Sequence, residues 1–209
     1  MSKRVFRFFI DFIDGQQKWL NSMSDRGYRL QACDKVSYMF EECKPNEYEY
    51  IVEYVGARSF SDANDYRQYF EDLGYRTFTK NINLNFSIGK ARWRPYSKSN
   101  AQIATSPGRY NKELLIIEKR KDSKPFELHT NVQDQNSIFK SLRNTYTYAT
   151  LLLFALLAVT FVPGVTSLSL GLTWALRIIV GVLGLVYLSL TRVYSVLVRK
   201  TEEEKQIFD

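Results

Sequence analysis

The chain has 209 residues, of which 24% are charged, and a formal net charge of +7. Its Lys and Arg residues are scattered among acids rather than massed in one helix or tail, which argues against a nucleic-acid-binding protein. A basic surface near an anionic membrane leaflet explains the same excess of positive charge. Residues 148–190 hold a single charged residue, Arg177, so the composition changes sharply near residue 147.

The first residues, "MSKRVFRFFIDF", are rich in aromatic and aliphatic side chains and predict a strand from about residue 4. They also place basic residues before a short apolar run. Asp11 and Asp14 interrupt that run and no small-residue cleavage site follows, so we do not expect export. The next segment, "DGQQKWLNSMSDRG", predicts a helix with Asp14 as its N-cap, and Gly27 is expected to end it in a left-handed conformation.

A second copy of this pattern follows three predicted strands at residues 28–33, 36–43 and 47–55. In "SDANDYRQYFEDLGYRTF" either Ser61 or Asp62 is expected to cap a helix that Gly74 ends, and both helices are followed by Tyr-Arg. Strand-like "TFTKNINLNFSI" and "ELLIIEKR" come next. The apolar positions that we expect to be buried are Trp19, Leu20, Met23, Tyr66, Tyr69, Phe70 and Leu73.

The repeat predicts an α+β cytoplasmic domain over residues 1–128, built from two β-α-β-β-like halves at about residues 4–56 and 60–120. Each half has a helix that must cover an antiparallel sheet on one face, and neither half alone has enough core. Two copies are too few for a solenoid. A connecting helix is expected at residues 129–145, and a charged cytoplasmic tail at residues 199–209.

Residues 89–111 interrupt the pattern with a long basic and aromatic loop. Loops of this length are often functional. Contact with acidic lipid headgroups, with a phosphate-bearing ligand or with a partner protein is one interpretation, and a solvated surface loop is the other. The contact residues would be Lys90, Arg92, Trp93, Arg94 and Arg109.

The apolar C-terminal third predicts a transmembrane helical hairpin over residues 146–198, with spans at about 146–165 and 172–192. Lys and Arg flank both outer ends and none lies in the connecting loop, which places both termini in the cytoplasm. Arg177 is expected near the outer end of the second span. Gly181 and Gly184 could pack closely, either within the hairpin or between copies in a homo-oligomer.

Residues for catalysis are not arranged in any recognisable pattern. Glu41 and Glu42 are adjacent on a strand and point to opposite faces, and Cys33, Cys43 and the single histidine, His129, lack the spacing of a metal site. We therefore expect no enzyme activity, no cofactor and no metal.

The motifs "KWLNSMSDRGYRL", "YMFEECKPNEYEYIVEY", "DYRQYFEDLGYR" and "PFEL", in this order, resemble the domain-of-unknown-function family 2812 over most of residues 5–140. The resemblance implies a bacterial protein, attached to the membrane through C-terminal spans and encoded beside a PadR-like transcriptional regulator. It implies no catalytic residues. The extended segment 89–111 departs from the family pattern.

Three functions remain open at this point. The leading one is a membrane-anchored sensor or adaptor whose cytoplasmic domain binds a partner protein or ligand in a regulatory or envelope-stress system. The partner could be a PadR-like regulator or another membrane protein. The second is a small oligomeric membrane protein that supports transport or envelope homeostasis. The third is a lipid- or small-ligand-binding protein that uses the tyrosine-rich sheet, with Tyr28, Tyr38, Tyr48, Tyr50 and Tyr75 as candidates.

Overall fold

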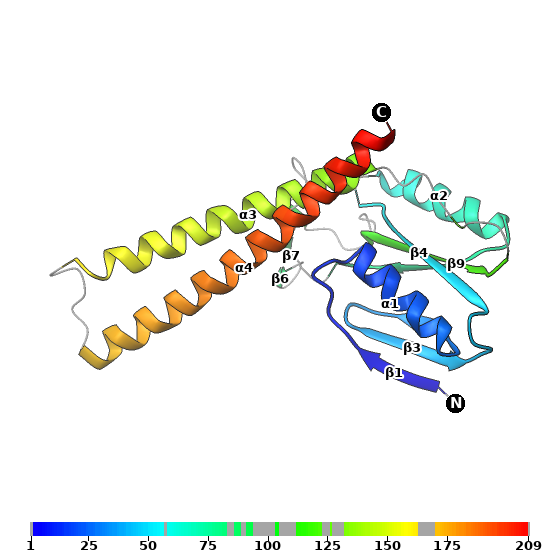
Figure 1. The fold of residues 1–209 in the computed structure, drawn as a ribbon, viewed down its shortest axis with the longest axis horizontal. Coiled ribbons are helices and arrows are strands. Elements are labelled where there is room, and N and C mark those ends of the chain that lie inside the picture. The colour runs from blue at the N-terminus through cyan, green and yellow to red at the C-terminus, as the bar shows by residue number, and fades with distance from the viewer. Residues whose placement is uncertain are drawn as a thin grey trace. The chain divides into compact units, whose positions relative to one another are not determined.

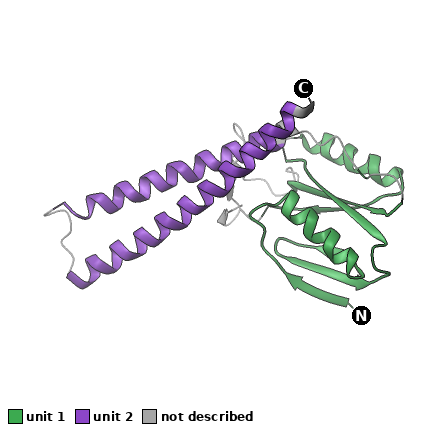
Figure 2. Cartoon of the chain, viewed as in Figure 1, with its two compact units in different colours: residues 1–94, 99–131 green, residues 95–98, 132–209 purple. Residues whose placement is uncertain are grey.

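The chain divides into two compact units (Figure 2), which we call the head (residues 1–94 and 99–131) and the helical pair (residues 95–98 and 132–209). The computed structural model describes residues 2–56, 58–82, 86–88, 91–93, 103–104, 112–122, 126, 132–162 and 170–208. Its element order is two strand–helix–strand units followed by two long helices, which confirms the predicted fold class (Figure 1).

The first sheet of the head has the strand order β1-β3-β2. Strand β1 (Ser2–Phe6) and strand β2 (Tyr28–Cys33) both pair antiparallel with β3 (Ser37–Glu42), and helix α1 (Asp14–Asp25) connects β1 to β2. A register shift between Leu30 and Ala32 interrupts the β2–β3 ladder at Gln31. Aromatic residues of α1 and β3 form the adjoining core, where the rings of Trp19 and Tyr38 lie 4.8 Å apart.

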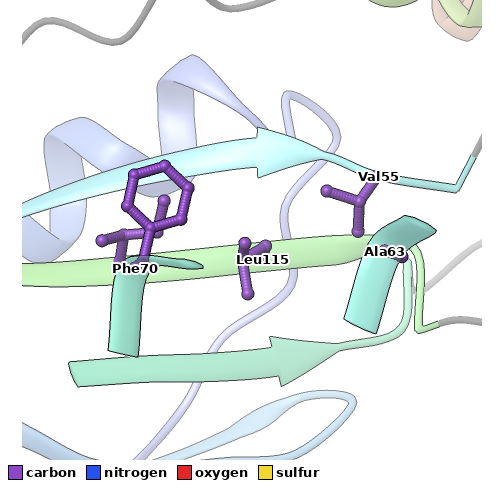
Figure 3. Close-up of a cluster of buried hydrophobic side chains, with 5 residues drawn as sticks. Val55, Ala63, Phe70 and Leu115 are labelled. Atoms are coloured by element: carbon purple, nitrogen blue, oxygen red, sulfur yellow. The ribbon is translucent and has the colours of Figure 1, made fainter. Parts of the chain in front are cut away.

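The second sheet repeats this arrangement with the order β4-β9-β5. Strands β4 (Tyr48–Tyr54) and β5 (Arg76–Lys80) flank β9 (Leu114–Arg120), and helix α2 (Phe60–Asp72) connects β4 to β5. One face of β9 packs against α2, and Figure 3 shows the cluster. Its buried members are Val55, Ala63, Phe70, Leu115 and Ile117.

Both sheets therefore have a split β-α-β topology, in which a third strand separates the two parallel ones. The strand order groups β4 with β9 and β5, so the boundary between the two sheets falls between β3 and β4. The sequence pattern had placed the boundary between the two halves after residue 56. Three short strands, β6 (Phe86–Ile88), β7 (Ala91–Trp93) and β8 (Ile103–Ala104), form a third sheet in the order β6-β7-β8.

The ends of α1 and α2 show how far local signals determine the helix boundaries. Gly27 and Gly74 follow the helices with φ of 81° and 83°, the left-handed conformation that glycine adopts at low cost, as predicted. The predicted N-caps are wrong. Helix α1 begins at Asp14, with Ile13 at the N-cap position and no side-chain cap. Helix α2 is capped by Ser59, whose Oγ accepts a hydrogen bond from the Asp62 N–H at 3.1 Å.

The expected apolar stripe of α2 is only partly buried. Phe70 is 2% exposed, whereas Tyr69 and Leu73 are 57% and 53% exposed. On α1 the prediction holds, because Trp19, Leu20 and Met23 are all buried.

The helical pair consists of α3 (Val132–Val159) and α4 (Leu170–Phe208). At 1.5 Å per residue these helices are about 42 and 58 Å long, more than the thickness of a hydrocarbon core of about 30 Å. Both are long and apolar enough to cross a membrane. The connecting helix expected before the first span is continuous with it in α3, and the segment expected as a charged tail is helical through Phe208.

Side chains of α1 form hydrogen bonds to the backbone along the outer edge of β4. Three polar residues of α1, spaced four and three positions apart and so on one face of the helix, contact three alternate residues of β4. These contacts join Gln17 to Val52, Asn21 to Tyr50 and Ser24 to Tyr48. Asn21 makes both possible bonds, since its Oδ1 accepts from the Tyr50 N–H at 2.8 Å and its Nδ2 donates to the Tyr50 carbonyl at 3.1 Å. A helix thus takes the place of a fourth strand.

Replacing Asn21 with Leu is expected to destabilise β4 by about 1–3 kcal/mol, because the backbone N–H and carbonyl of Tyr50 lose their partners in a partly buried place. The measurement is amide hydrogen exchange of the β4 peptide in the full chain. Lys18→Leu, at an exposed position of the same helix, serves as the control. Equal protection of β4 in the two variants would contradict the role of Asn21.

Candidate functional site

The two halves of the head are joined by a polar cluster around Glu118. This β9 side chain is 2% exposed, and its Oε1 accepts hydrogen bonds from Arg29 Nε at 2.9 Å and Nη2 at 2.7 Å. Tyr50 Oη donates to the Glu118 Oε2 at 2.8 Å and accepts from the Leu30 N–H at 2.9 Å. The hydrogen bond to Glu118 raises the pKa of Arg29, and burial raises the pKa of Tyr50. Arg29 therefore remains a cation and Tyr50 a neutral hydroxyl.

The repeated Tyr-Arg pattern supplies both arginines of this junction. Arg29 on β2 lies opposite Glu41, and Arg76 on β5 lies opposite Glu118, at the same place in each half. Each arginine nevertheless reaches into the other half. Arg29 makes its shorter ion pair with Glu118, at 2.7 Å against 3.7 Å to Glu41. Arg76 donates to the carbonyls of Leu30 at 3.3 Å and Gln31 at 3.2 Å.

A second cluster surrounds Lys80 at the end of β5. Lys80 is only 2% exposed. Its Nζ donates a hydrogen bond to Gln16 Oε1 at 3.4 Å and lies 5.1 Å from the centre of the Tyr38 ring. Two further donors in this part of the core, Gln16 Nε2 and Tyr38 Oη, are buried without a hydrogen-bond partner among the described residues. The cluster is therefore rich in donors.

Burial dominates the protonation behaviour of this cluster. It lowers the pKa of Lys80 from 10.5 to about 8, and the nearby Cys33 and Asp34 oppose that change. Burial raises the pKa of the Cys33 thiol from 9.0 to about 11, with Lys80 acting in the opposite direction. At neutral pH the thiol is therefore protonated and weakly nucleophilic. Cys33 and Cys43 are both free and half-buried.

Acidic, histidine and cysteine side chains do not gather into a metal-binding group anywhere in the residues that the structure describes. Glu41 and Glu118 belong to the arginine junction, so their carboxylates are already used. Tyr38 and Tyr50, two of the tyrosines considered as ligand-binding residues, are fully buried. These side chains thus belong to the core of the head and to the junction between its two halves.

The two helices of the helical pair pack along a regular seam. On α4 the buried and half-buried positions include a series with alternating steps of four and three residues, the spacing of a left-handed coiled coil. This series is Thr173, Arg177, Val180, Gly184, Tyr187, Thr191, Tyr194, Val198 and Thr201. Aromatic rings fill one section of the seam, where Tyr146 of α3 stacks on Tyr194 of α4 at 5.4 Å.

The opposite faces of both helices are apolar and exposed. Leu152 on α3 is 62% exposed, and Ile178 and Leu185 on α4 are 62% and 59% exposed. In each candidate membrane segment only 11% of the residues in the apolar window are buried, whereas the core helix of a soluble protein is mostly buried. Exposed apolar surface of this extent is typical of a region that contacts lipid.

The predicted packing residues of α4 contact α3 of the same chain. A side chain at Gly184 would place its Cβ 3.4 Å from Phe154 Cζ, and one at Gly181 would lie 3.9 Å from Leu157 Cδ2. Arg177 Nη2 donates to the Thr160 carbonyl at 2.5 Å, and its guanidinium lies 4.2 Å from the Phe161 ring and 5.1 Å from the Trp174 ring. It therefore satisfies a carbonyl at the C-terminal end of α3.

The described structure contains two of the five predicted contact residues. Arg92 and Trp93 lie on β7, where Arg92 pairs with Ser87 and Ala104 and Trp93 pairs with Phe86 and Ile103. Lys90, Arg94 and Arg109 lie outside the described residues. Their contact role stays a prediction.

Sequence reasoning missed Glu118 and Lys80. A signal existed for both, because each is a charged residue at the end of a strand whose neighbours two positions away are buried on one face. In "ELLIIEKR" Glu118 lies two positions after the buried Ile116, and in "TFTKNI" Lys80 lies two positions before the buried Ile82. A charge in such a register requires a buried partner or a shifted pKa.

Comparison with known proteins gives one match. A family model described as "Protein of unknown function (DUF2812)" matches residues 12–151, from the loop before α1 to the middle of α3. Strand β1 and helix α4 lie outside the matched range. No curated protein and no solved structure matches this chain.

Replacing Lys80 with Met is expected to stabilise the head at pH 7, because burial disfavours the ammonium form in the folded chain. The fall of the Lys80 pKa from 10.5 to about 8 corresponds to about 3 kcal/mol. The unfolded chain binds more protons than the folded one between about pH 8 and 10.5, so the stability of the unmodified chain rises over that window. The gain from Met should be complete below pH 8 and shrink toward pH 10.5.

The measurement is chemical denaturation of the full chain in mild detergent, followed by near-ultraviolet circular dichroism at several pH values. Lys44→Met, at an exposed position, is the matched control and should leave stability nearly unchanged. A loss of stability in the Lys80 variant that is the same at every pH would contradict the prediction, because it would show that the buried ammonium group does not destabilise the folded chain.

Proposed function

Because the chain belongs to the DUF2812 family, whose description names no activity, we propose from its structure that it is a membrane-anchored sensor or adaptor. In this proposal the helical pair crosses the cell membrane twice and the head binds a protein partner or ligand in the cytoplasm. The observation that carries it is the combination of a head with a polar, interlocked core and a helical pair with an exposed apolar surface.

The membrane placement rests on where apolar and charged residues lie along the helices. Most exposed apolar residues of the helices lie between Tyr148 and Val159 on α3 and between Leu170 and Val186 on α4. Beyond them, Lys140 of α3 forms an ion pair with Glu202 of α4 at 2.7 Å, with both side chains about half exposed. Such a pair belongs in water, so the two helices would leave the bilayer before reaching it.

The orientation follows from the flanking positive charge. Lys140 and Arg143 precede the apolar part of α3, and Arg192, Arg199 and Lys200 follow that of α4, while the segment between the helices contains no Lys or Arg. Positive residues are retained on the cytoplasmic side. The head and the C-terminal end of α4 would therefore both be cytoplasmic.

A binding role for the head is supported by the exposed face of α2. Tyr69 and Leu73 lie one helical turn apart and are 57% and 53% exposed. Apolar residues at this spacing are typical of a helix that docks against a partner. A partner protein, such as a transcriptional regulator of the PadR type, is the occupant that we propose.

Arginine substitutions distinguish a membrane helix from a soluble one. Leu152→Arg and Leu185→Arg change residues that are 62% and 59% exposed, so in a soluble protein they should cost almost nothing. In a bilayer each should cost about 2.5–3.5 kcal/mol of insertion free energy. We expect the double variant to be lost from the alkali-resistant membrane pellet, while Val196→Arg, at a position 66% exposed, stays in it. Release of the unmodified chain by alkali would refute membrane anchorage.

Site-specific photo-crosslinking tests the binding role. A photoreactive residue at Tyr69 or at Leu73 should give the same adduct of defined mass in intact cells, because both side chains lie on the proposed docking face. A photoreactive residue at Lys44, which is exposed on a turn of the head, is the control and should not give it. Identical adduct patterns at all three positions would contradict a specific docking face.

A further inference from the structure

The exposed side of helix α2 combines two apolar side chains with three acids. Tyr69 and Leu73 are 57% and 53% exposed, and neither belongs to the buried cluster that α2 forms with β9. Asp62, Asp65 and Asp72 are exposed as well. Steps of three or four residues connect these five positions along the helix, so the five side chains lie close together on its surface. We call these five residues the α2 face.

Helix α1 shows that the fold does not require this composition. When the two helices of the repeat are aligned at the glycines that end them, different kinds of residue stand at the corresponding positions. The pairs are Ser22 with Tyr69, Arg26 with Leu73, and Lys18 with Asp65. One copy of the unit therefore folds with polar and basic residues where the other has an aromatic ring, a leucine and an acid. The composition of the α2 face thus points to a contact outside the fold.

The α2 face is acidic although the chain is basic. Residues 58–74 contain four acids and two cations, a net charge of −2 in a chain with a net charge of +7. Arg67 forms an ion pair with Glu71 at 3.6 Å, and the Arg58 guanidinium lies 4.0 Å from the Tyr66 ring. The three aspartates of the α2 face form no ion pair with any residue that the structure describes.

The strands beneath α2 do not offset this charge. On the side of the second sheet that α2 covers, the strands carry two acids, Glu49 and Glu53 of β4, and one cation, Lys119 of β9. Lys119 forms an ion pair with Asp122 at 2.6 Å, so its charge is already compensated. The described surroundings of α2 therefore leave a negative excess.

Shape and charge together select the chemistry of the partner. Asp65, Tyr69 and Leu73 follow one another at steps of four, and a ridge of this kind packs into the groove of another helix. An anionic membrane surface or a nucleic acid would place negative charge against the aspartates. A second copy docked through the same face would bring two sets of aspartates together. A helix with an apolar stripe flanked by cations meets both parts of the surface.

We propose that the α2 face binds a basic amphipathic helix of a partner protein. Apolar side chains of that helix pack on Tyr69 and Leu73, and its Lys or Arg side chains lie against Asp62, Asp65 and Asp72. The inference rests on the docking role proposed above for α2 and adds the chemistry of the partner. Exposed charges around a small apolar contact act mainly on the rate of association and on the choice of partner.

The test uses the full chain in nanodiscs of neutral phosphatidylcholine, with a photoreactive residue in place of Tyr69 or Leu73. The probes are two helical peptides of about 15 residues that share one leucine stripe and carry either lysine or glutamate beside it. We expect the lysine peptide to give about ten times more adduct at low salt. The two yields should converge at about 1 M salt, where screening acts over about 3 Å. A photoreactive residue at Arg26, the α1 position that corresponds to Leu73, is the control and should show no such preference.

Charge variants with the photoreactive residue at Leu73 separate the α2 face from the net charge of the chain. Asp72→Lys should weaken the preference for the lysine peptide, and Asp65→Lys with Asp72→Lys should reverse it. Asp65→Asn with Asp72→Asn should weaken the preference without reversing it. The control Asp25→Lys makes the same change as Asp72→Lys at the corresponding exposed position of α1, and should retain the preference. Unchanged hydrogen exchange of β9 shows that a variant is folded.

Equal yields from the two peptides at low salt would overturn the inference, as would loss of the preference in Asp25→Lys as complete as in Asp72→Lys. In intact cells, the adduct at Tyr69 should contain a partner segment with Lys or Arg at helical spacing, and an adduct with an acidic segment, a lipid or a second copy of the chain would also overturn it. Absence of any adduct in cells would instead refute the docking role of α2. The two failures are distinguishable because the peptide experiment needs no cellular partner.

Discussion

The arrangement of the two halves of the head depends on the hydrogen bonds between side chains of helix α1 and the edge of strand β4. A three-stranded sheet leaves two edge strands with unpaired backbone groups, and in the second sheet one of these edges is β4. The side chains of Gln17, Asn21 and Ser24 form hydrogen bonds to the backbone of that edge. The helix of the first half therefore completes the sheet of the second half. Apolar packing tolerates small shifts, whereas these bonds require one register between helix and strand. The two halves are therefore fixed relative to each other by hydrogen bonds between side chains of α1 and the backbone of β4.

The arginine junction adds charge to the same connection, and it shows why a duplicated unit does not form two independent domains. Each half holds an arginine opposite a glutamate at corresponding positions, Arg29 with Glu41 and Arg76 with Glu118. If each pair stayed within its own half, the halves could separate at little cost. Arg29 instead bonds to the buried Glu118, and Tyr50 donates to the same carboxylate. Separation would break the ion pair of Arg29 with Glu118 and the hydrogen bond from the Leu30 N–H to the Tyr50 hydroxyl.

Local chemistry in the sequence was enough to predict most elements but not how they join. The strand at Tyr28–Cys33 and the glycines at 27 and 74 were predicted at the correct positions, because the signals are confined to a few neighbouring residues. One prediction failed where neighbouring residues compete for the same role. Ser59 caps α2 in place of Ser61 or Asp62, two nearby residues of similar capping ability.

Tertiary context explains the other failures. Tyr69 and Leu73 have helical spacing, yet the face they occupy is exposed, and only the fold decides which of two apolar faces is covered. The division into two sheets, and the partners of Lys80 and Glu118, depend on contacts between residues as many as 89 positions apart, which periodicity does not report.

The polar and small residues in the seam of the helical pair have their partners within the same chain. Small residues on a membrane helix indicate close approach to a partner, and the partner of Gly184 is Phe154 of the same chain. The lone cation of the apolar part is likewise satisfied within the chain, since Arg177 donates to the Thr160 carbonyl and lies against two aromatic rings. The features that would normally drive assembly of membrane helices are thus used inside the hairpin. The exposed surface of the described helices is mostly aliphatic and aromatic, so the polar and small residues of the seam find their partners within one chain.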